Sequence, residues 1–394
     1  VAFDRLLLDE AGQPRADAAL GFIFNFSDLN AATLLGKLDI PVLSMIGLYG
    51  RSEQEWRESK SGLTVLEGTC QLAVPELAGT IAPTIVGSKE RVRDADSGIT
   101  SIFTHPIDSR VDIAVRRALK YAELRRKSNA QKRVALMFYN FPPGKANVGA
   151  SYLNVAASIA SILQRLKREG YDLGEADLSS DSVLRDITTQ ALNVMGRAPG
   201  ELERMLQNGN AIRIGANEYR RWLDDYAPGL RAKILKDWGP PEASQLMLTK
   251  LGGKTEPVVP RVRYGNIVLL PQPARGWGED LEKMYHAKDL APHHQYVATY
   301  TWLRNAWQAD AIVHLGTHGT LEWLDGKDAG LSEEDAPDAL IADLPDLYVY
   351  NVDVVGEGLV ARRRGMAALV DHMVPPFTKG GLYPQLAKLA ETIN

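Results

Sequence analysis

The chain has 394 residues, of which 45% are hydrophobic, 24% are charged and 7% are aromatic. This composition excludes disordered, collagen-like and disulfide-stapled proteins, and the length predicts two or three domains. The net charge of −4 excludes the basic field of a nucleic-acid binder, and the single cysteine, Cys70, excludes metal sites made of several thiolates.

Residues 1–128 are predicted to form a first α/β unit. Apolar strands are expected at 20–26, 41–46 and 83–86, and helices at 28–37 and 110–126. Ser52 and Glu55 have the spacing of a capping box, which predicts a short helix carrying Trp56. Because apolar strands alternate with helices, a parallel sheet is favoured.

Residues 129–260 are predicted to form a second α/β unit with a helical insertion. We interpret the basic run at 125–133 as a solvated linker that leads into an apolar strand at 134–139. The segments that follow are a loop at 140–149, an amphipathic helix at 152–169, a mainly helical stretch at 176–238, and a loop or hairpin at 250–262.

Residues 261–394 are predicted to form a third α/β unit that carries a histidine-rich site. Strands are expected at 265–272, 311–315 and 347–352, and helices at 294–309 and from Gly356 onward. The predicted fold class is therefore α/β, with several Rossmann-like parallel-sheet units, a mainly helical insertion and a ligand cleft between units.

The loop at 140–149 follows the carboxyl end of a predicted strand, where open α/β sheets bind ligands. Gly144 and Gly149 allow the backbone to approach a ligand, and Lys145 supplies a positive charge. The alternative is a proline-stiffened connection that binds nothing. Residues 253–255 lack both the earlier glycine and the preceding strand of a P-loop, so we expect no ATPase site in this chain.

The strongest motif runs from His314 to Lys327, where an apolar strand ends at His314 and two glycines form a tight loop. His318 and Glu322 are four residues apart, so a helix starting here would place both near one face. Two imidazoles and a carboxylate at a strand end are typical of a metal or acid–base site. The alternative is a pair of structural histidines bonded to backbone carbonyls.

Histidines concentrate in this part of the chain, where six of the seven lie between His286 and His372. His293 and His294 follow a proline at a predicted helix start, where the helix dipole disfavours imidazolium and keeps the rings able to bind a metal. The alternative for these two is a solvated helix cap. We expect five rings to converge in space: His286, His293, His294, His314 and His318.

The segment from His314 to Lys327 resembles the signature of the large subunit of the tetrapyrrole metal chelatases. This family includes the CobN-type cobaltochelatase subunit and the H subunit of magnesium chelatase. Further matching segments cover most of the chain: 38–42, 74–77, 141–149, 152–155, 264–268, 272–273, 292–294, 356–358 and 361–364. Asp325 departs from the pattern, because many relatives have proline there.

The resemblance implies the tetrapyrrole-binding large subunit of an ATP-dependent metal chelatase, with the ATPase supplied by partner subunits. It also implies that this chain, which begins at Val1, is the central fragment of a longer protein. The sequence contains no apolar run long enough to span a bilayer and no recognisable signal peptide, so a cytoplasmic location is expected.

Within the family, we favour a cobaltochelatase that inserts Co²⁺ into a corrin precursor, hydrogenobyrinate a,c-diamide. Imidazole ligands suit cobalt and iron, whereas Mg²⁺ prefers oxygen ligands. Residues 322–324 resemble the cobalt branch, whereas the loop at 141–147 is closer to the magnesium branch. The alternatives are a haem or metallotetrapyrrole dechelatase, a magnesium chelatase H subunit, and a non-catalytic tetrapyrrole carrier or sensor; Fe²⁺ and Mg²⁺ are the alternative metal substrates.

The resemblance also implies roles for individual residues. The expected bases for the two pyrrole protons are His314, His318 and Glu322. The expected metal contacts are His293, His294, His314 and His318. The expected substrate contacts are Asn140, Lys145, Asn147, Gln272, Arg275, Trp277, Trp323 and Glu357. A flat ring would pack on Trp and Tyr faces, and its carboxylates would meet Arg275, Lys145 or the arginines at 362–364.

Overall fold

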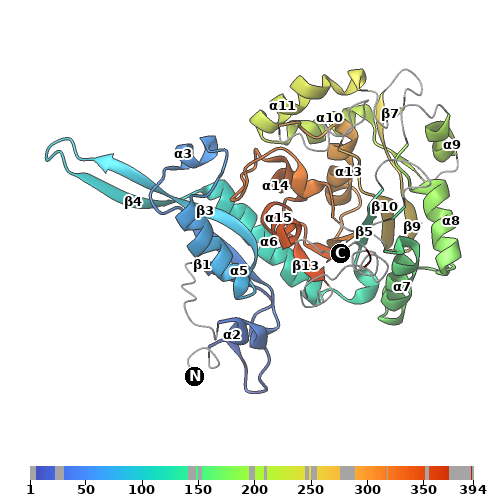
Figure 1. Cartoon of the computed structure of the whole chain (residues 1–394), viewed down its shortest axis with the longest axis horizontal. Coiled ribbons are helices and arrows are strands. Elements are labelled where there is room, and N and C mark those ends of the chain that lie inside the picture. The colour runs from blue at the N-terminus through green and yellow to red at the C-terminus, as the bar shows by residue number, and fades with distance from the viewer. Residues whose placement is uncertain are drawn as a thin grey trace.

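In the residues that it describes, the computed structural model has a mixed α/β fold with three sheets (Figure 1). It describes residues 6–22, 31–140, 148–149, 153–194, 200–207, 211–244, 248–249, 255–275, 289–316, 318–350, 355–371 and 392. None of the helices in these ranges combines the length and the apolar character needed to cross a membrane.

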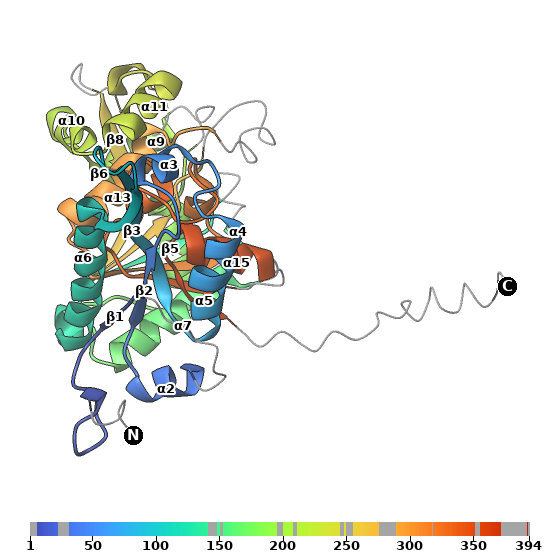
Figure 2. The same ribbon diagram turned by 90° about the vertical axis from the view of Figure 1, so that its left-hand side faces the viewer.

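The first sheet has the order β1-β2-β3-β4. Its strands are β1 (Ala19–Phe22), β2 (Val42–Gly47), β3 (Ile81–Arg93) and β4 (Thr100–Pro106). The first three strands are parallel, as predicted. Figure 2 shows α6 (Asp108–Arg126) on one side of this sheet and α4 (Val65–Glu67) and α5 (Val74–Leu77) on the other.

Local signals in this first unit are confirmed. Ser52 and Glu55 form the predicted capping box at the start of α3 (Glu53–Glu58), and Trp56 of this helix is buried. The remaining elements here are α2 (Ala31–Leu38) and a π-helical turn at Gly68–Ala73.

The hairpin formed by β3 and β4 was not predicted. The predicted strand at 83–86 continues to Arg93 and returns antiparallel as β4, all of whose residues are exposed. Figure 1 shows the hairpin extending away from the other elements. Because neither face of its outer part is buried, the sequence there has no apolar alternation to reveal it.

The second sheet has the order β13-β12-β11-β5-β10-β9. Its strands are β5 (Val134–Phe138), β9 (Val262–Tyr264), β10 (Ile267–Pro271), β11 (Ala311–Gly316), β12 (Asp346–Tyr350) and β13 (Ala368–Asp371). All pairs are parallel except β9 with β10. Strands from both of the predicted units 129–260 and 261–394 therefore belong to one sheet, and the boundary between those units stays a prediction.

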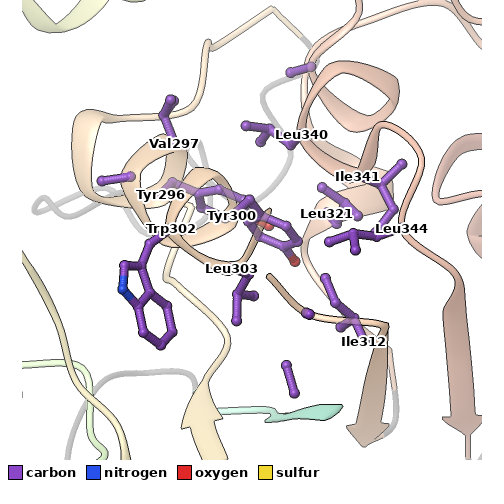
Figure 3. Close-up of a cluster of buried hydrophobic side chains, with 14 of the residues drawn as sticks. Tyr296, Val297, Tyr300, Trp302, Leu303, Ile312, Leu321, Leu340, Ile341 and Leu344 are labelled. Carbon is purple, nitrogen blue, oxygen red and sulfur yellow. The ribbon is translucent and has the colours of Figure 1, made fainter. Parts of the chain in front are cut away.

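Side chains of β5 alternate between two hydrophobic clusters. Val134, Leu136 and Phe138 pack with α7 (Val155–Arg168) and α8 (Ser180–Gln190). Ala135 and Met137 pack with α13 (His294–Asn305), and Figure 3 shows this second cluster. Because both faces are covered, the strand is a continuous apolar run, which is why it could be predicted.

The insertion between β5 and β10 is mainly helical, as predicted. It contains α8, α9 (Glu201–Gln207), α10 (Ala216–Asp224) and α11 (Pro228–Trp238). A small antiparallel sheet accompanies them, with β6 (Ile212–Arg213), β8 (Glu256–Val259) and β7 (Leu248–Thr249) in that order. Two further helices in the described part of the chain are α14 (Ala336–Ile341) and α15 (Val355–Arg364).

The basic run at 125–133 connects α6 to β5 and is exposed or half-buried, as predicted for a linker, but it also makes specific contacts that were not predicted. Lys127 Nζ lies 2.7 Å from Asp310 Oδ2. The Arg133 guanidinium lies 5.6 Å from the centre of the Trp307 ring. The run therefore attaches the end of α6 to the segment between α13 and β11, through contacts with residues far away in the sequence.

Two buried arginines of α6 join the first unit to α14. Arg110 Nη1 lies 2.7 Å from Asp338 Oδ2, and Arg117 Nη2 lies 2.6 Å from Asp338 Oδ1. Burial opposes ionisation of Asp338, but the two guanidinium groups outweigh it and hold the pKa of the carboxyl below its usual value. The triad fixes the first sheet against the second, because separating it would leave buried charges unpaired.

Replacing Asp338 by Asn should lower the free energy of unfolding by about 3–5 kcal/mol, because two buried guanidinium groups lose their counter-charge. The lowered native pKa means that Asp338 stabilises the fold above about pH 4 and that this contribution is lost as the pH falls through the native value. Denaturant unfolding at about pH 7 and pH 3 measures this effect. The free energy of unfolding should fall less between the two pH values in the variant than in the wild type.

The matched control is Asp112→Asn. Asp112 pairs with Arg116 on the exposed face of the same helix, so its loss should cost at most about 0.5 kcal/mol. Equal losses in the two variants would contradict the proposed role of Asp338.

Candidate functional site

Loops that follow β5, β10 and β11 meet at the carboxyl edge of the six-stranded sheet. Asn140 follows β5 and Gln272 follows β10, and Asn193 joins the two. The backbone N–H of Asn193 donates to Asn140 Oδ1 at 3.0 Å, and its Nδ2 donates to the Gln272 carbonyl at 2.7 Å. All three residues are buried, so this hydrogen-bonded group lies inside the protein at the sheet edge. Open α/β sheets bind ligands at such an edge.

His318 lies between two aromatic rings at the same edge. Its ring centre is 5.2 Å from that of Tyr139 and 6.2 Å from that of Trp323, edge to face in both cases. The Nδ1–H group donates to the Gly319 carbonyl at 2.8 Å, which places the basic lone pair on Nε2. His318 and Tyr139 are half-buried and Trp323 is 37% exposed, so this group faces the surface.

Glu322 lies beneath this aromatic group. Its Oε1 accepts the Gly319 N–H at 3.0 Å and the Tyr348 hydroxyl at 2.7 Å, and the residue is 0% exposed. Within the described part of the chain, its Oε2 accepts no hydrogen bond. The helix that would align His318 with Glu322 is not formed, because only a short 3-10 turn covers residues 321–323.

His314 is also buried, one strand position inside the sheet edge. Its Nδ1 lies 2.7 Å from Asp346 Oδ1, and its Nε2 lies 3.0 Å from the Tyr300 hydroxyl. Burial opposes protonation of this imidazole, but the carboxylate of Asp346, with Glu322 further off, outweighs it and raises the pKa of His314. Both ring nitrogens of His314 have hydrogen-bond partners, so we interpret His314 as a structural residue beside the site.

His293 is the N-cap of α13 and His294 is its first residue, and both are buried rather than solvated. His293 Nε2–H donates to the Ala274 carbonyl at 2.7 Å, and its Nδ1 accepts the Tyr296 N–H. His294 Nε2–H donates to the Gly239 carbonyl at 2.9 Å, and its Nδ1 lies 2.8 Å from the Tyr219 hydroxyl. A metal-binding role for either ring would require these hydrogen bonds to break.

Burial has the same electrostatic effect on both of these rings. It lowers the pKa of His293 to about 4 and lowers that of His294. The expectation that the two rings are neutral therefore agrees with the structure. Among the described residues, no three His, Cys, Asp or Glu side chains are grouped so that they could hold a metal ion.

Two of the predicted histidines, His293 and His314, lie along one row of aromatic rings. His293 contacts Tyr296, Tyr296 stacks on Tyr300 with ring centres 5.4 Å apart, and Tyr300 lies against His314. Figure 3 shows the two tyrosines side by side along α13. His294 points instead to the helical insertion through its contact with Tyr219.

The other predicted substrate contacts differ in how deeply they are buried, and some of them lie outside the described residues. Arg275 is buried, and Glu357 is half-buried in the first turn of α15. Arg362 and Arg363 bind Thr80 and Glu76 of the first unit. Four expected residues are outside the described part of the chain: Lys145, Asn147, Trp277 and His286.

The sequence prediction missed several residues that shape the site: Tyr139, Asn193, Tyr300, Asp346 and Tyr348. One signal was present, because Asp346 and Tyr348 alternate with Leu347 and Val349 along β12. Polar side chains at every second position of a strand indicate one polar face. The predicted strand began at 347 and therefore left Asp346 out.

Comparison with known proteins agrees with the resemblance noted from the motifs. The family described as CobN/Magnesium Chelatase matches residues 3–394. The chain belongs to the CobN/magnesium chelatase family. Several individual members can be compared with it directly.

The chain is 34% identical over 366 residues to the magnesium-chelatase subunit ChlH of Oryza sativa subsp. indica, covering 92% of this chain and 24% of the relative. It is 32% identical over 364 residues to the aerobic cobaltochelatase subunit CobN of a Sinorhizobium species, covering 92% and 27%. The fold is similar to the catalytic subunit of cobaltochelatase from Mycobacterium tuberculosis, with a TM-score of 0.76, 33% identity and coverage of 96% and 32%. This CobN/magnesium chelatase family chain therefore spans about a quarter to a third of the length of these relatives.

Burial of His293 predicts a pH dependence of folding. An unfolded imidazole has a pKa near 6.5, so the unfolded chain takes up the proton first as the pH falls. The neutral ring contributes to the free energy of unfolding above about pH 6.5, and this contribution should be lost as the pH falls toward the native pKa of about 4. In His293→Gln, which keeps a donor for the Ala274 carbonyl, the loss between these pH values should be smaller by up to about 3 kcal/mol.

Urea unfolding at several pH values between about 7 and 4 measures this difference. His105→Gln is the control. His105 is exposed on β4, so its replacement should give the same change of unfolding free energy with pH as the wild type shows. If the unfolding free energy of His293→Gln changed with pH as it does in the wild type, the fold would not be keeping the His293 ring neutral.

Proposed function

We propose that this chain is the part of a tetrapyrrole metal chelatase large subunit that holds the ring and accepts its pyrrole protons at His318. The observation that carries the proposal is the half-buried imidazole between Tyr139 and Trp323 at the carboxyl edge of the sheet. Aromatic faces suit a flat conjugated ring, and an imidazole beside them is a group that can accept and donate protons.

Metal insertion releases two N–H protons from the ring for each divalent ion that enters, so a base must take them up. In the tautomer set by Gly319, Nε2 of His318 is the atom that accepts a proton, and it passes the proton to water before the second transfer. The reverse reaction, metal removal, uses the same atom as the donor. The ring's carboxylates would be held by arginine or lysine side chains, for which Arg275 and Lys145 remain proposals.

We infer that cobalt is the metal substrate, because an imidazole at the point of entry suits Co²⁺ better than Mg²⁺. The corresponding ring is a corrin precursor such as hydrogenobyrinate a,c-diamide. ATP would act through partner subunits, as the family resemblance implies. A binding panel of hydrogenobyrinate a,c-diamide, protoporphyrin and haem, read by absorbance, tests this choice, and preferential binding of protoporphyrin would favour the magnesium branch.

Replacing His318 by Ala should abolish metal insertion and leave tetrapyrrole binding largely intact. General-base catalysis typically contributes 10²- to 10⁴-fold, so we expect a rate at least about 100-fold lower with a tetrapyrrole Kd within about twofold of the wild type. The measurement is Co²⁺ insertion by the subunit with its ATPase partners, followed by absorbance. His105→Ala is the control, and full turnover in His318→Ala would refute the role of this ring.

Trp323 should contribute to ring binding by stacking. Replacing Trp323 by Ala removes an aromatic contact worth about 0.5–1.5 kcal/mol, so the tetrapyrrole Kd should rise about 2- to 13-fold. Trp323→Phe keeps an aromatic face and should bind within about twofold of the wild type. Absorbance titration measures both, and equal affinities for the Ala and Phe variants would place the ring elsewhere.

A further inference from the structure

Two hydrogen bonds on one oxygen of Glu322 connect the His318 loop to β12. The Gly319 N–H, directly after His318, donates to Oε1 at 3.0 Å. The Tyr348 hydroxyl donates to the same oxygen at 2.7 Å. The first bond fixes the backbone next to the imidazole, and the second fixes the carboxylate to a strand of the sheet.

The space around Gly319 is fully used by this arrangement. A Cβ atom at Gly319 would lie 2.0 Å from the Tyr348 hydroxyl and 3.0 Å from the Gln272 side-chain amide. The loop can therefore approach Tyr348 only because residue 319 has no side chain. The close approach brings the backbone beside His318 within reach of the Glu322 carboxylate.

Tyr348 is itself held in a rigid environment. It is 1% exposed and packs with Ala361 and Ala367. Tyr348 is the register partner of His314 on the neighbouring strand, and their ring centres are 5.0 Å apart. His314 is in turn bonded to Asp346, two residues before Tyr348 on the same strand. The hydroxyl that holds Glu322 is therefore placed by the core of the sheet.

We propose that Tyr348 and Glu322 are positioning residues that set the orientation of the His318 imidazole toward the bound ring. Tyr348 holds the carboxylate, and the carboxylate holds the Gly319 amide. The proposal rests on the proposed function of His318 and changes the predicted role of Glu322. A carboxylate that is 0% exposed, behind the loop and bonded through one oxygen to two donors, acts on the substrate through His318 rather than as a base.

Tyr348→Phe tests the first link, because it removes one hydroxyl and keeps the ring. With the full subunit and its ATPase partners, kcat for Co²⁺ insertion should fall at least about tenfold, while KM for the tetrapyrrole stays within about twofold. Small displacements of a catalytic group reduce rate in this way without affecting binding. The control is Tyr226→Phe, which removes another buried tyrosine hydroxyl, 2.7 Å from Thr301 Oγ1.

Glu322→Gln and Glu322→Ala test the second link. Gln keeps an oxygen that can accept from both donors, so Glu322→Gln should retain insertion within about threefold of the wild type. Ala cannot accept, so Glu322→Ala should lose at least tenfold. If Gln is as inactive as Ala, Glu322 is a base and the positioning role is wrong.

Hydrogen exchange separates this proposal from the proposed function. The Gly319 amide should exchange at least about fivefold faster in Tyr348→Phe than in the wild type and in Tyr226→Phe. A wild-type subunit that inserts no metal would refute the proposed function, and the exchange measurement would still decide the positioning role. Unchanged exchange, or wild-type kcat in Tyr348→Phe, would overturn the inference.

Discussion

The position of β5 between β10 and β11 is the constraint on which the site depends. Val134 is the register partner of both Ile267 on β10 and Ala311 on β11, and Phe138 pairs with Pro271 and Leu315. The three parallel strands therefore end at one level, although β10 and β11 lie more than a hundred residues further along the chain. Because the chain fills one side of β5 first and the other side afterwards, the loops after these strands diverge at a topological switch point, where ligand sites of open sheets form.

The segment from His314 to Lys327 is used for two purposes. Its first half forms the site edge, whereas its second half holds the first unit in place. Lys327 bonds to Asp335 and lies over the Trp56 ring, and Trp56 donates to the Gly330 carbonyl. Arg364 donates to several carbonyls of residues 322–327 from beneath. Buried loop carbonyls need donors, so this one guanidinium fixes the second half of the segment.

The sequence was most informative where the cause of structure is local. The apolar run of β5, the capping box at Ser52 and the strand ending at the His314 segment could all be predicted, because periodicity and capping act over a few residues. The family could also be recognised, because each of its motifs is a short continuous stretch that can be read directly from the sequence. The β3–β4 hairpin could not be predicted, because its outer part is exposed on both faces and shows no apolar alternation. The attachment of Lys127 could not be predicted either, because its ion pair with Asp310 joins residues distant in sequence.

The same limit explains why the histidine count gave too many candidate ligands. An imidazole serves as a base or a metal ligand only if one nitrogen is available to the substrate, and the sequence does not record what the other groups around it are. The partners that occupy His293, His294 and His314 are the Ala274 and Gly239 carbonyls and the side chains of Tyr219, Asp346 and Tyr300, together with one local amide. These bonds make the three rings part of the protein's internal polar structure. Burying them neutral or paired supports the sheet edge, whereas His318, which we propose as the base, is half-buried at this edge and contacts the rings of Tyr139 and Trp323.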